Sequence, residues 1–282
     1  MYKLKVKYNQ YNTVELTNNP DYNVYNIEGL DQPDSSLGSS ANTTSHGSKI
    51  TSARVTSRNI VIYLKLKGDI EKSRLNLYQY FPQCENVTIY FSNGRRDVSI
   101  DAKVEKVNCP PFASMEVAQI SLLCEKPFFK AIEEVQTTFG DIDPLFVFPF
   151  SIPEEGIEFS AITPHIRKSI ISESGVDTGA IITLYASGEV VNPIIYNISD
   201  GTYMKLNYTM QNLDTIIINT NIGEKSIVLI RNGVKHNLLG YMNLGSKWVV
   251  LSPGDNVFSY DCDSGNNNLQ ITFTTSVLYS GV

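Results

Sequence analysis

Apolar and polar side chains alternate along the first third of the chain. Between positions 2 and 8, Leu4, Val6 and Tyr8 alternate with three lysines. A period of two is typical of a half-buried β-strand. The same reasoning predicts strands over 2–8, 13–16, 22–27, 50–55 and 58–67.

One segment departs from this pattern and predicts a helix, over residues 70–81. Asp69 can cap its first free N–H groups, and Leu75, Leu77, Tyr78 and Phe81 are expected to form an apolar side. Pro82 ends the helix, because the residue before a proline is pushed out of the helical region.

A hairpin follows the helix. Two apolar-alternating runs, 87–91 and 98–107, flank the pair Asn93-Gly94. Asn-Gly is the favoured pair for a type I′ turn between antiparallel strands. A further alternating run at 115–124 is predicted to be a strand.

Residues 29–48 contain almost no large apolar side chains. Such a segment cannot build its own core, and loops of about 20 residues are uncommon inside compact domains. We therefore expect a long loop or arm that contacts a partner. Its candidate contact residues are Leu30, Pro33, Leu37 and His46.

The second half repeats short apolar runs at roughly ten-residue spacing, with turn signals such as Pro253-Gly254 between them. Evenly spaced short strands are typical of a β-sandwich or barrel. The predicted strands are 180–185, 194–198, 204–208, 215–219, 227–231, 248–251, 256–260 and 269–278. A proline-interrupted connection precedes them, so we expect domains at 1–135 and 161–282 joined by a linker at 136–160.

Composition agrees with a mostly β protein, because the chain has 9 Ala against 25 Asn. Residues 1–130 hold 16 Lys and Arg against 13 Asp and Glu, a net charge of +3, whereas 131–282 hold 7 against 16, a net of −9. This asymmetry favours two domains with different neighbours. A pI of about 5.2 argues against nucleic-acid binding. The sequence has no long apolar run and no signal-peptide core, so we expect a soluble product made in the cytoplasm.

No constellation of catalytic or metal-ligating residues stands out. The four cysteines form no C-x-x-C pair, and the three histidines stand alone. Neither a nucleophile elbow, a P-loop nor a dinucleotide fingerprint occurs. We therefore expect no enzyme, no metal and no cofactor. The single tryptophan, Trp248, is interpreted as a core residue rather than a sugar-stacking platform.

The order of these elements, with several short segments, resembles the siphophage tail-component family, the distal tail proteins of long-tailed bacteriophages. In the N-terminal part the resemblance rests on the strand set, the helix, the Asn93-Gly94 hairpin and the closing strand that ends at 123–129. In the C-terminal part it rests on PIIYNISDG (193–201), DTIIINT (214–220), SKW (246–248), LSPGDN (251–256) and LYSGV (278–282). It covers nearly the whole chain.

This resemblance implies a mainly β fold. An N-terminal β-sandwich-like ring domain, with one short α-helix and an extended arm, would precede a galectin-like or carbohydrate-binding-module-like β-sandwich. It also implies a homo-oligomer, a hexameric ring at the tail tip of the virion. The ring would join the tail tube protein to tail-associated and receptor-binding proteins, without nucleic acid, membrane or cofactor.

The resemblance also implies structural roles for particular residues. Asn93, Gly94, Trp248, Pro253, Gly254 and Asn256 are expected as fold signatures, and the arm at 29–48 would lie across a neighbouring subunit. The alternative function is a carbohydrate-binding β-sandwich that recognises host cell-wall glycans through Trp248 or tyrosines. A β-sandwich glycosidase is a third hypothesis, but no pair of carboxylates can be named as its catalytic acid and base.

Overall fold

The computed structural model describes every residue except 1, 43–45, 112–115, 140, 145–159 and 164–166. The described chain is mostly β-strand, as expected, and falls into two units. The first unit comprises 1–132 together with 278–282, and the second comprises 133–277. Most of the linker expected at 136–160 lies outside the described residues. The last five residues belong to the first unit, although the sequence suggested a C-terminal domain that reached 282.

The first unit is built on antiparallel strands that pair in the order β2-β1-β7-β8-β9-β6-β3. Its elements are β1 (Lys3–Lys7), β2 (Thr13–Glu15), β3 (Tyr22–Glu28), β4 (Ser35–Ala41), β5 (Ser48–Val55), β6 (Arg58–Leu66), α1 (Ile70–Tyr80), β7 (Asn86–Ser92), β8 (Asp97–Asn108) and β9 (Val117–Cys124). The predicted alternation appears directly in the packing, since Ile60, Ile62 and Leu64 of β6 are fully buried. Of the residues expected on the apolar side of the helix, Leu77 and Phe81 lie in the same core, whereas Leu75 and Tyr78 are exposed.

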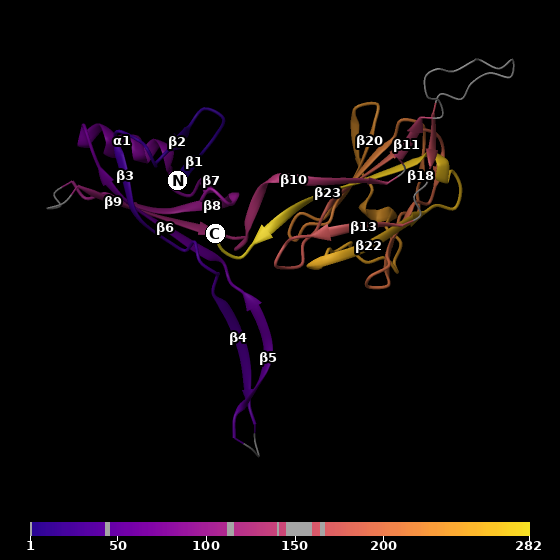
Figure 1. Ribbon diagram of the computed structural model, residues 1–282, viewed down its shortest axis with the longest axis horizontal. Helices are drawn as coiled ribbons and strands as arrows, with labels where there is room; N and C mark the ends of the chain where they lie inside the picture. Colours follow the sequence, from indigo (N-terminus) through magenta and orange to yellow (C-terminus); the bar gives the residue numbers. More distant parts are fainter. Residues whose placement is uncertain (1, 43–45, 112–115, 140, 145–159, 164–166) are drawn as a thin grey trace. The chain divides into compact units, whose positions relative to one another are not determined.

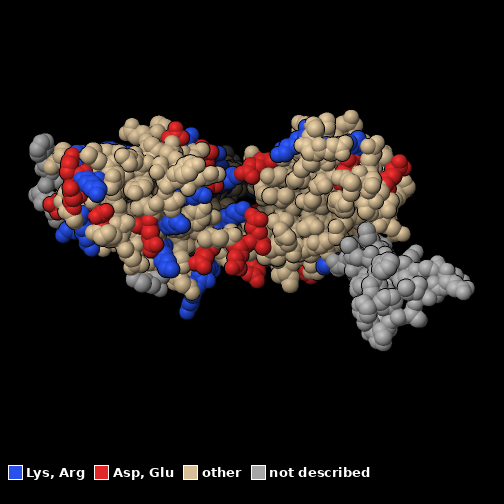
Figure 2. Space-filling view, turned by 90° about the horizontal axis from the view of Figure 1, so that it is seen from above, with Lys and Arg blue, Asp and Glu red and all other residues tan. Residues whose placement is uncertain are grey.

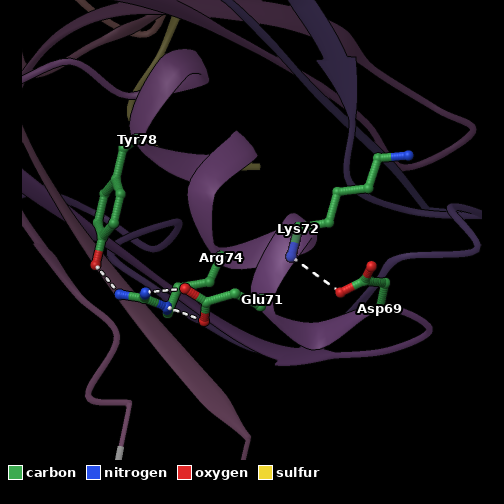
Figure 3. Close-up of polar contacts among 5 residues, drawn as sticks. All are labelled: Asp69, Glu71, Lys72, Arg74 and Tyr78. Atoms are coloured by element: carbon green, nitrogen blue, oxygen red, sulfur yellow. Dashed lines mark hydrogen bonds and ion pairs between the residues drawn. The ribbon is translucent and has the colours of Figure 1, made fainter.

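Helix α1 begins as the sequence predicts. The Asp69 carboxylate accepts a hydrogen bond from the Lys72 backbone N–H at 3.1 Å and so caps the first turn (Figure 3). On the outer face, Arg74 pairs with Glu71 and donates to the Tyr78 hydroxyl at 3.4 Å. The hydrogen bond from Arg74 holds the pKa of Glu71 below its ordinary value. Because the pair is exposed, it fixes side-chain positions more than it stabilises the fold.

The second unit is a β-sandwich. One sheet has the order β10-β23-β14-β19-β20-β21, and the other β13-β22-β16-β17. The strands are β10 (Phe129–Phe139), β11 (Asp141–Pro144), β12 (Ser160–Thr163), β13 (Lys168–Ser172), β14 (Ile181–Ala186), β15 (Val190–Val191), β16 (Ile194–Asn197), β17 (Thr202–Lys205), β18 (Thr209–Met210), β19 (Thr215–Asn219), β20 (Ser226–Arg231), β21 (Val234–Asn237), β22 (Gly254–Asp261) and β23 (Leu269–Tyr279). Two short 3₁₀ turns lie at Leu239–Tyr241 and Asn266–Asn268.

Side chains from both sheets meet in one core. Phe273 of β23 lies 4.9 Å from Phe258 of β22, measured between ring centroids, and both are fully buried. Inward residues alternate with outward ones along β14 and β19, as in the sequence pattern. The expected mainly β fold is therefore confirmed, while the galectin-like character of this sandwich stays a prediction. Among the described residues, no helix is long and apolar enough to cross a membrane.

Two local predictions were wrong. Residues 248–251 form no strand, and only Leu251 makes an isolated bridge, to Thr178. The turn at Asn93 is not type I′, since Gly94 has φ +82° whereas Asn93 does not have a positive φ. Instead, the Asn93 N–H donates to the Arg96 carbonyl, and its side chain accepts from the Arg95 and Arg96 backbone N–H groups. Positive φ at Gly94 alone excludes a type I′ turn centred on Asn93-Gly94.

An ion pair between the buried Asp214 and the partly exposed Arg231 closes the loop between β18 and β19. Arg231 donates to both carboxylate oxygens of Asp214, at 2.7 and 2.5 Å, and the Gln211 backbone N–H adds a third hydrogen bond at 2.7 Å. The Asp214 side chain is almost wholly inaccessible to solvent. These hydrogen bonds, that from Arg231 foremost, hold the pKa of Asp214 below its ordinary value.

We expect Asp214 to make the second unit sensitive to acid. Because its folded-state pKa is depressed, its contribution to the free energy of unfolding is present above about pH 5 and is lost as pH falls through the folded pKa. Urea unfolding followed by fluorescence of Trp248, the single tryptophan, reports on the second unit. The difference between wild type and Asp214→Asn should shrink towards acid pH, and a constant difference down to pH 2 would contradict this assignment.

Candidate functional site

The arm predicted from the sequence is a β-hairpin, formed by β4 and β5. Figure 1 shows the two strands projecting together from the rest of the first unit. They pair antiparallel from Ser35↔Val55 to Ala41↔Ser48. The arm is therefore longer than the expected loop at 29–48, and the strand predicted at 50–55 is part of it. Serine and glycine give little burial signal, but their backbone groups still pair, which is why the sequence pattern missed β4.

A β-bulge in β5 determines which side chains of the arm lie on the same face. Strand register shifts between Gly38 and Ser39, where β5 carries one extra residue. Because side chains alternate along a strand, Ile50 would otherwise lie on the face opposite Val55. The shift places Ile50 opposite Ser39, on the face that also carries Leu37 and Val55.

The apolar face of the arm is exposed. It comprises the directly opposed pairs Ser35–Val55, Leu37–Ala53, Ser39–Ile50 and Ala41–Ser48. Leu37 is 57% exposed, Ile50 60% and Val55 43%. The other face, which we call the polar face, pairs Ser36 with Arg54, Gly38 with Ser52 and Ser40 with Lys49. An amphipathic hairpin without a core of its own is suited to cover a surface elsewhere.

The edge of β4 lacks the features that usually prevent a strand from pairing with another chain. Strand β4 has the sequence SSLGSSA, and between 35 and 55 the chain has Lys49 and Arg54 but no Asp, Glu or Pro. Long edge strands usually carry charges or prolines that prevent pairing with other chains. Strand β4 lacks both, which favours a covered edge in an assembly.

The four arm residues expected from the sequence lie in different settings. Leu37 is on the apolar face, and His46 is exposed near the tip. Leu30, in contrast, is half-buried against the core of the first unit, and Pro33 is half-buried before β4 begins. Leu30 and Pro33 thus belong to the arm root, which we define as residues 29–34.

The arm root is held by Arg58, a residue that sequence reasoning did not single out. Arg58 is 3% exposed, and its guanidinium donates four hydrogen bonds to backbone carbonyls. The acceptors are Gly29 at 2.5 Å, Asp31 at 2.5 Å, Pro127 at 2.7 Å and Ser280 at 2.5 Å. The Phe129 ring lies 4.6 Å from Cζ. Burial lowers the pKa of Arg58, and the Coulombic influence of Cys124 and Asp31 opposes this shift.

The C-terminal residues pack beside this guanidinium. We call residues 278–282 the tail segment. Its Gly281 carbonyl accepts a hydrogen bond from Arg96 Nη1 at 2.9 Å, and Arg96 lies 4.3 Å from the centroid of the Tyr279 ring. The Val282 N–H donates to the Leu30 carbonyl at 3.1 Å. The LYSGV motif of the sequence therefore forms part of the first unit.

The fold-signature residues of the second unit have structural settings. Asn256 is buried and bonds the backbone of Ser252 twice, through Oδ1 at 2.9 Å and Nδ2 at 2.7 Å. Gly254 takes a positive φ of +95° after Pro253. Trp248 is half-buried against the core of the second unit, with Lys225 Nζ 5.4 Å from its ring centroid.

Charge is distributed unevenly on the surface. Figure 2 shows Lys, Arg, Asp and Glu interspersed over the first unit, whereas the second unit is mostly uncharged on the same face. All four cysteines are free thiols. The described residues include no cluster of three or more His, Cys, Asp or Glu side chains suited to a metal ion.

Replacing Arg58 by lysine should destabilise the first unit by about 2 kcal/mol or more, since an ammonium cannot satisfy four divergent carbonyls. Urea unfolding followed by circular dichroism measures the loss, and Trp248 fluorescence monitors the second unit in the same samples. Arg54→Lys, an exposed change on the arm, is the matched control. Equal stability of the two variants would contradict the role assigned to Arg58.

Comparison with known proteins found a matching protein family and similar solved structures. Residues 173–276 match a family described as siphovirus-type tail component, C-terminal domain. The crystal structure of the Dit protein of phage SPP1, described as a paradigm of the hub adsorption apparatus in phages that infect Gram-positive bacteria, is similar over 97% of this chain and 98% of that one. The TM-score is 0.70 at 13% sequence identity.

Two structures of the phage P2 baseplate in its activated conformation are also similar. The one with Ca has a TM-score of 0.52 at 14% identity, and the one with Sr has 0.51 at 13%, each over 100% of both chains. No curated protein sequence matches significantly. The resemblance drawn from the sequence is confirmed: residues 173–276 match a siphovirus-type tail component domain, and the chain shares its fold with the Dit protein of phage SPP1.

Proposed function

We propose that the chain is a structural, non-enzymatic component of a bacteriophage or prophage tail tip. In this proposal six copies form a ring-shaped hub, which joins the tail tube protein to tail-associated and receptor-binding proteins. The first unit builds the ring, and the second unit holds the adsorption apparatus. Support comes from the match of the second unit to a tail-component family and from the fold shared with phage SPP1 Dit.

The observation that carries the assembly part of the proposal is the exposed apolar face of the arm. Leu37, Ile50 and Val55 lie on one face of a hairpin that has no core of its own. The bulge in β5 is needed to bring Ile50 to that face, which supports a selected surface rather than a chance exposure. In the proposal this face packs on the neighbouring copy, and repetition around a closed ring covers every arm.

The carbohydrate-binding alternative has less support. Trp248, its main candidate, is half-buried against the core and has Lys225 over its ring. A sugar-stacking platform requires an open aromatic face. The alternative also assigns no role to the arm.

The two faces of the arm provide a matched pair of variants. Leu37→Asp with Ile50→Asp adds two charges to the apolar face, and Ser36→Asp with Ser52→Asp adds two to the polar face. Sedimentation and light scattering should give wild type and the polar-face variant a mass near six times 31.5 kDa. The apolar-face variant should be monomeric, because burying a charge on an apolar contact is costly.

Two outcomes would contradict the proposal. If wild type stays monomeric both alone and with its tail tube protein, the ring is wrong. If both arm variants assemble equally, the arm is not the contact. A monomer that binds host cell-wall polysaccharide would favour the carbohydrate-binding alternative.

A further inference from the structure

The arm root and the tail segment share one guanidinium. Arg58 Nη1 donates to the Gly29 and Asp31 carbonyls of the root, while Nη2 donates to the Ser280 carbonyl of the tail segment. A guanidinium is rigid and planar, so its N–H groups cannot move independently. Displacement of either segment therefore misaligns the hydrogen bonds to the other.

Direct contacts reinforce this link. The Val282 N–H donates to the Leu30 carbonyl at 3.1 Å. Gly281 lies so close to the root that an added Cβ would stand 3.3 Å from the Leu30 carbonyl oxygen and 3.4 Å from the Gln32 nitrogen. The tail segment thus packs directly on the backbone from which the arm departs.

The tail segment begins with the last two residues of β23, whose residues 269–277 belong to the second unit. The fourth acceptor of Arg58, the Pro127 carbonyl, lies shortly before β10, through which the chain enters the second unit. Both chain connections between the units therefore lie within a few residues of a carbonyl bound to Arg58. None of the four carbonyls carries a formal charge, so the site holds backbone segments and not a particular acidic side chain.

We propose that Arg58 is a positioning residue that couples the arm to the tail segment. When the tail segment is bound to Arg58, the arm root is held in place. When the contacts of the tail segment are lost, the arm root becomes free to move. The coupling stands on contacts within one chain and goes beyond the proposed hub function. In an assembly it would make the direction of the arm depend on how the second unit's last strand is held.

Arg96 provides a way to loosen the tail segment without touching the root. Its guanidinium binds the Gly281 carbonyl and lies over the Tyr279 ring, and it is exposed enough that Arg96→Ala should fold. Arg95→Ala is the matched control, because the neighbouring turn uses only the Arg95 backbone N–H. Hydrogen–deuterium exchange by mass spectrometry on the full chain follows both segments.

In Arg96→Ala, amides of the tail segment should exchange about fivefold faster, the factor expected for losing one ordinary hydrogen bond. The proposal requires a similar rise at the root and at Thr56, whose N–H donates to the Asp34 carbonyl of the root. Peptides from β9 should not change, which separates coupling from global destabilisation. Faster exchange of the tail segment with an unchanged root would overturn the proposal.

Gly281→Val supplies a second perturbation, because its side chain must displace the tail segment or the root. Faster exchange at both segments supports coupling, and a change confined to one segment contradicts it. A double-mutant cycle with Arg58→Lys identifies the route. If Arg58 carries the coupling, Arg96→Ala should no longer affect the root in the Arg58→Lys background, and additive effects would overturn that assignment.

Discussion

The buried guanidinium of Arg58 is the interaction on which the arrangement of the first unit depends. It donates to four backbone carbonyls, which belong to three segments far apart in sequence. Because a buried donor that loses its acceptor is costly, the buried guanidinium holds these segments together. The arm root, the entry to β10 and the tail segment are thereby gathered around one side chain.

In the rest of the described chain, backbone N–H and C=O groups form hydrogen bonds mainly between antiparallel strands. The first unit and the sandwich of the second unit each bury one face of their strands in a separate core. The arm is the exception, because its strands pair with each other yet bury neither face. Its stability and direction must come from the root on one side and, in our proposal, from a neighbouring copy on the other.

The sequence pattern predicted the features that depend on short stretches of the chain. Strands such as β6 and β19, the capped helix and the mainly β class followed from alternation and from Asp69. The pairing of β4 with β5 could not be seen, since serine-rich strands leave no burial periodicity. The role of Arg58 could not be predicted either, because its partners are main-chain carbonyls up to 222 positions away, which no side-chain motif records.

In the proposed hub, a second copy of the chain covers the apolar face of the arm. Electron cryomicroscopy of the purified oligomer tests this contact most directly. We predict a six-fold ring in which Leu37 and Ile50 are buried against the adjacent subunit. A ring in which the arms extend into solvent, with those two side chains exposed, would contradict it.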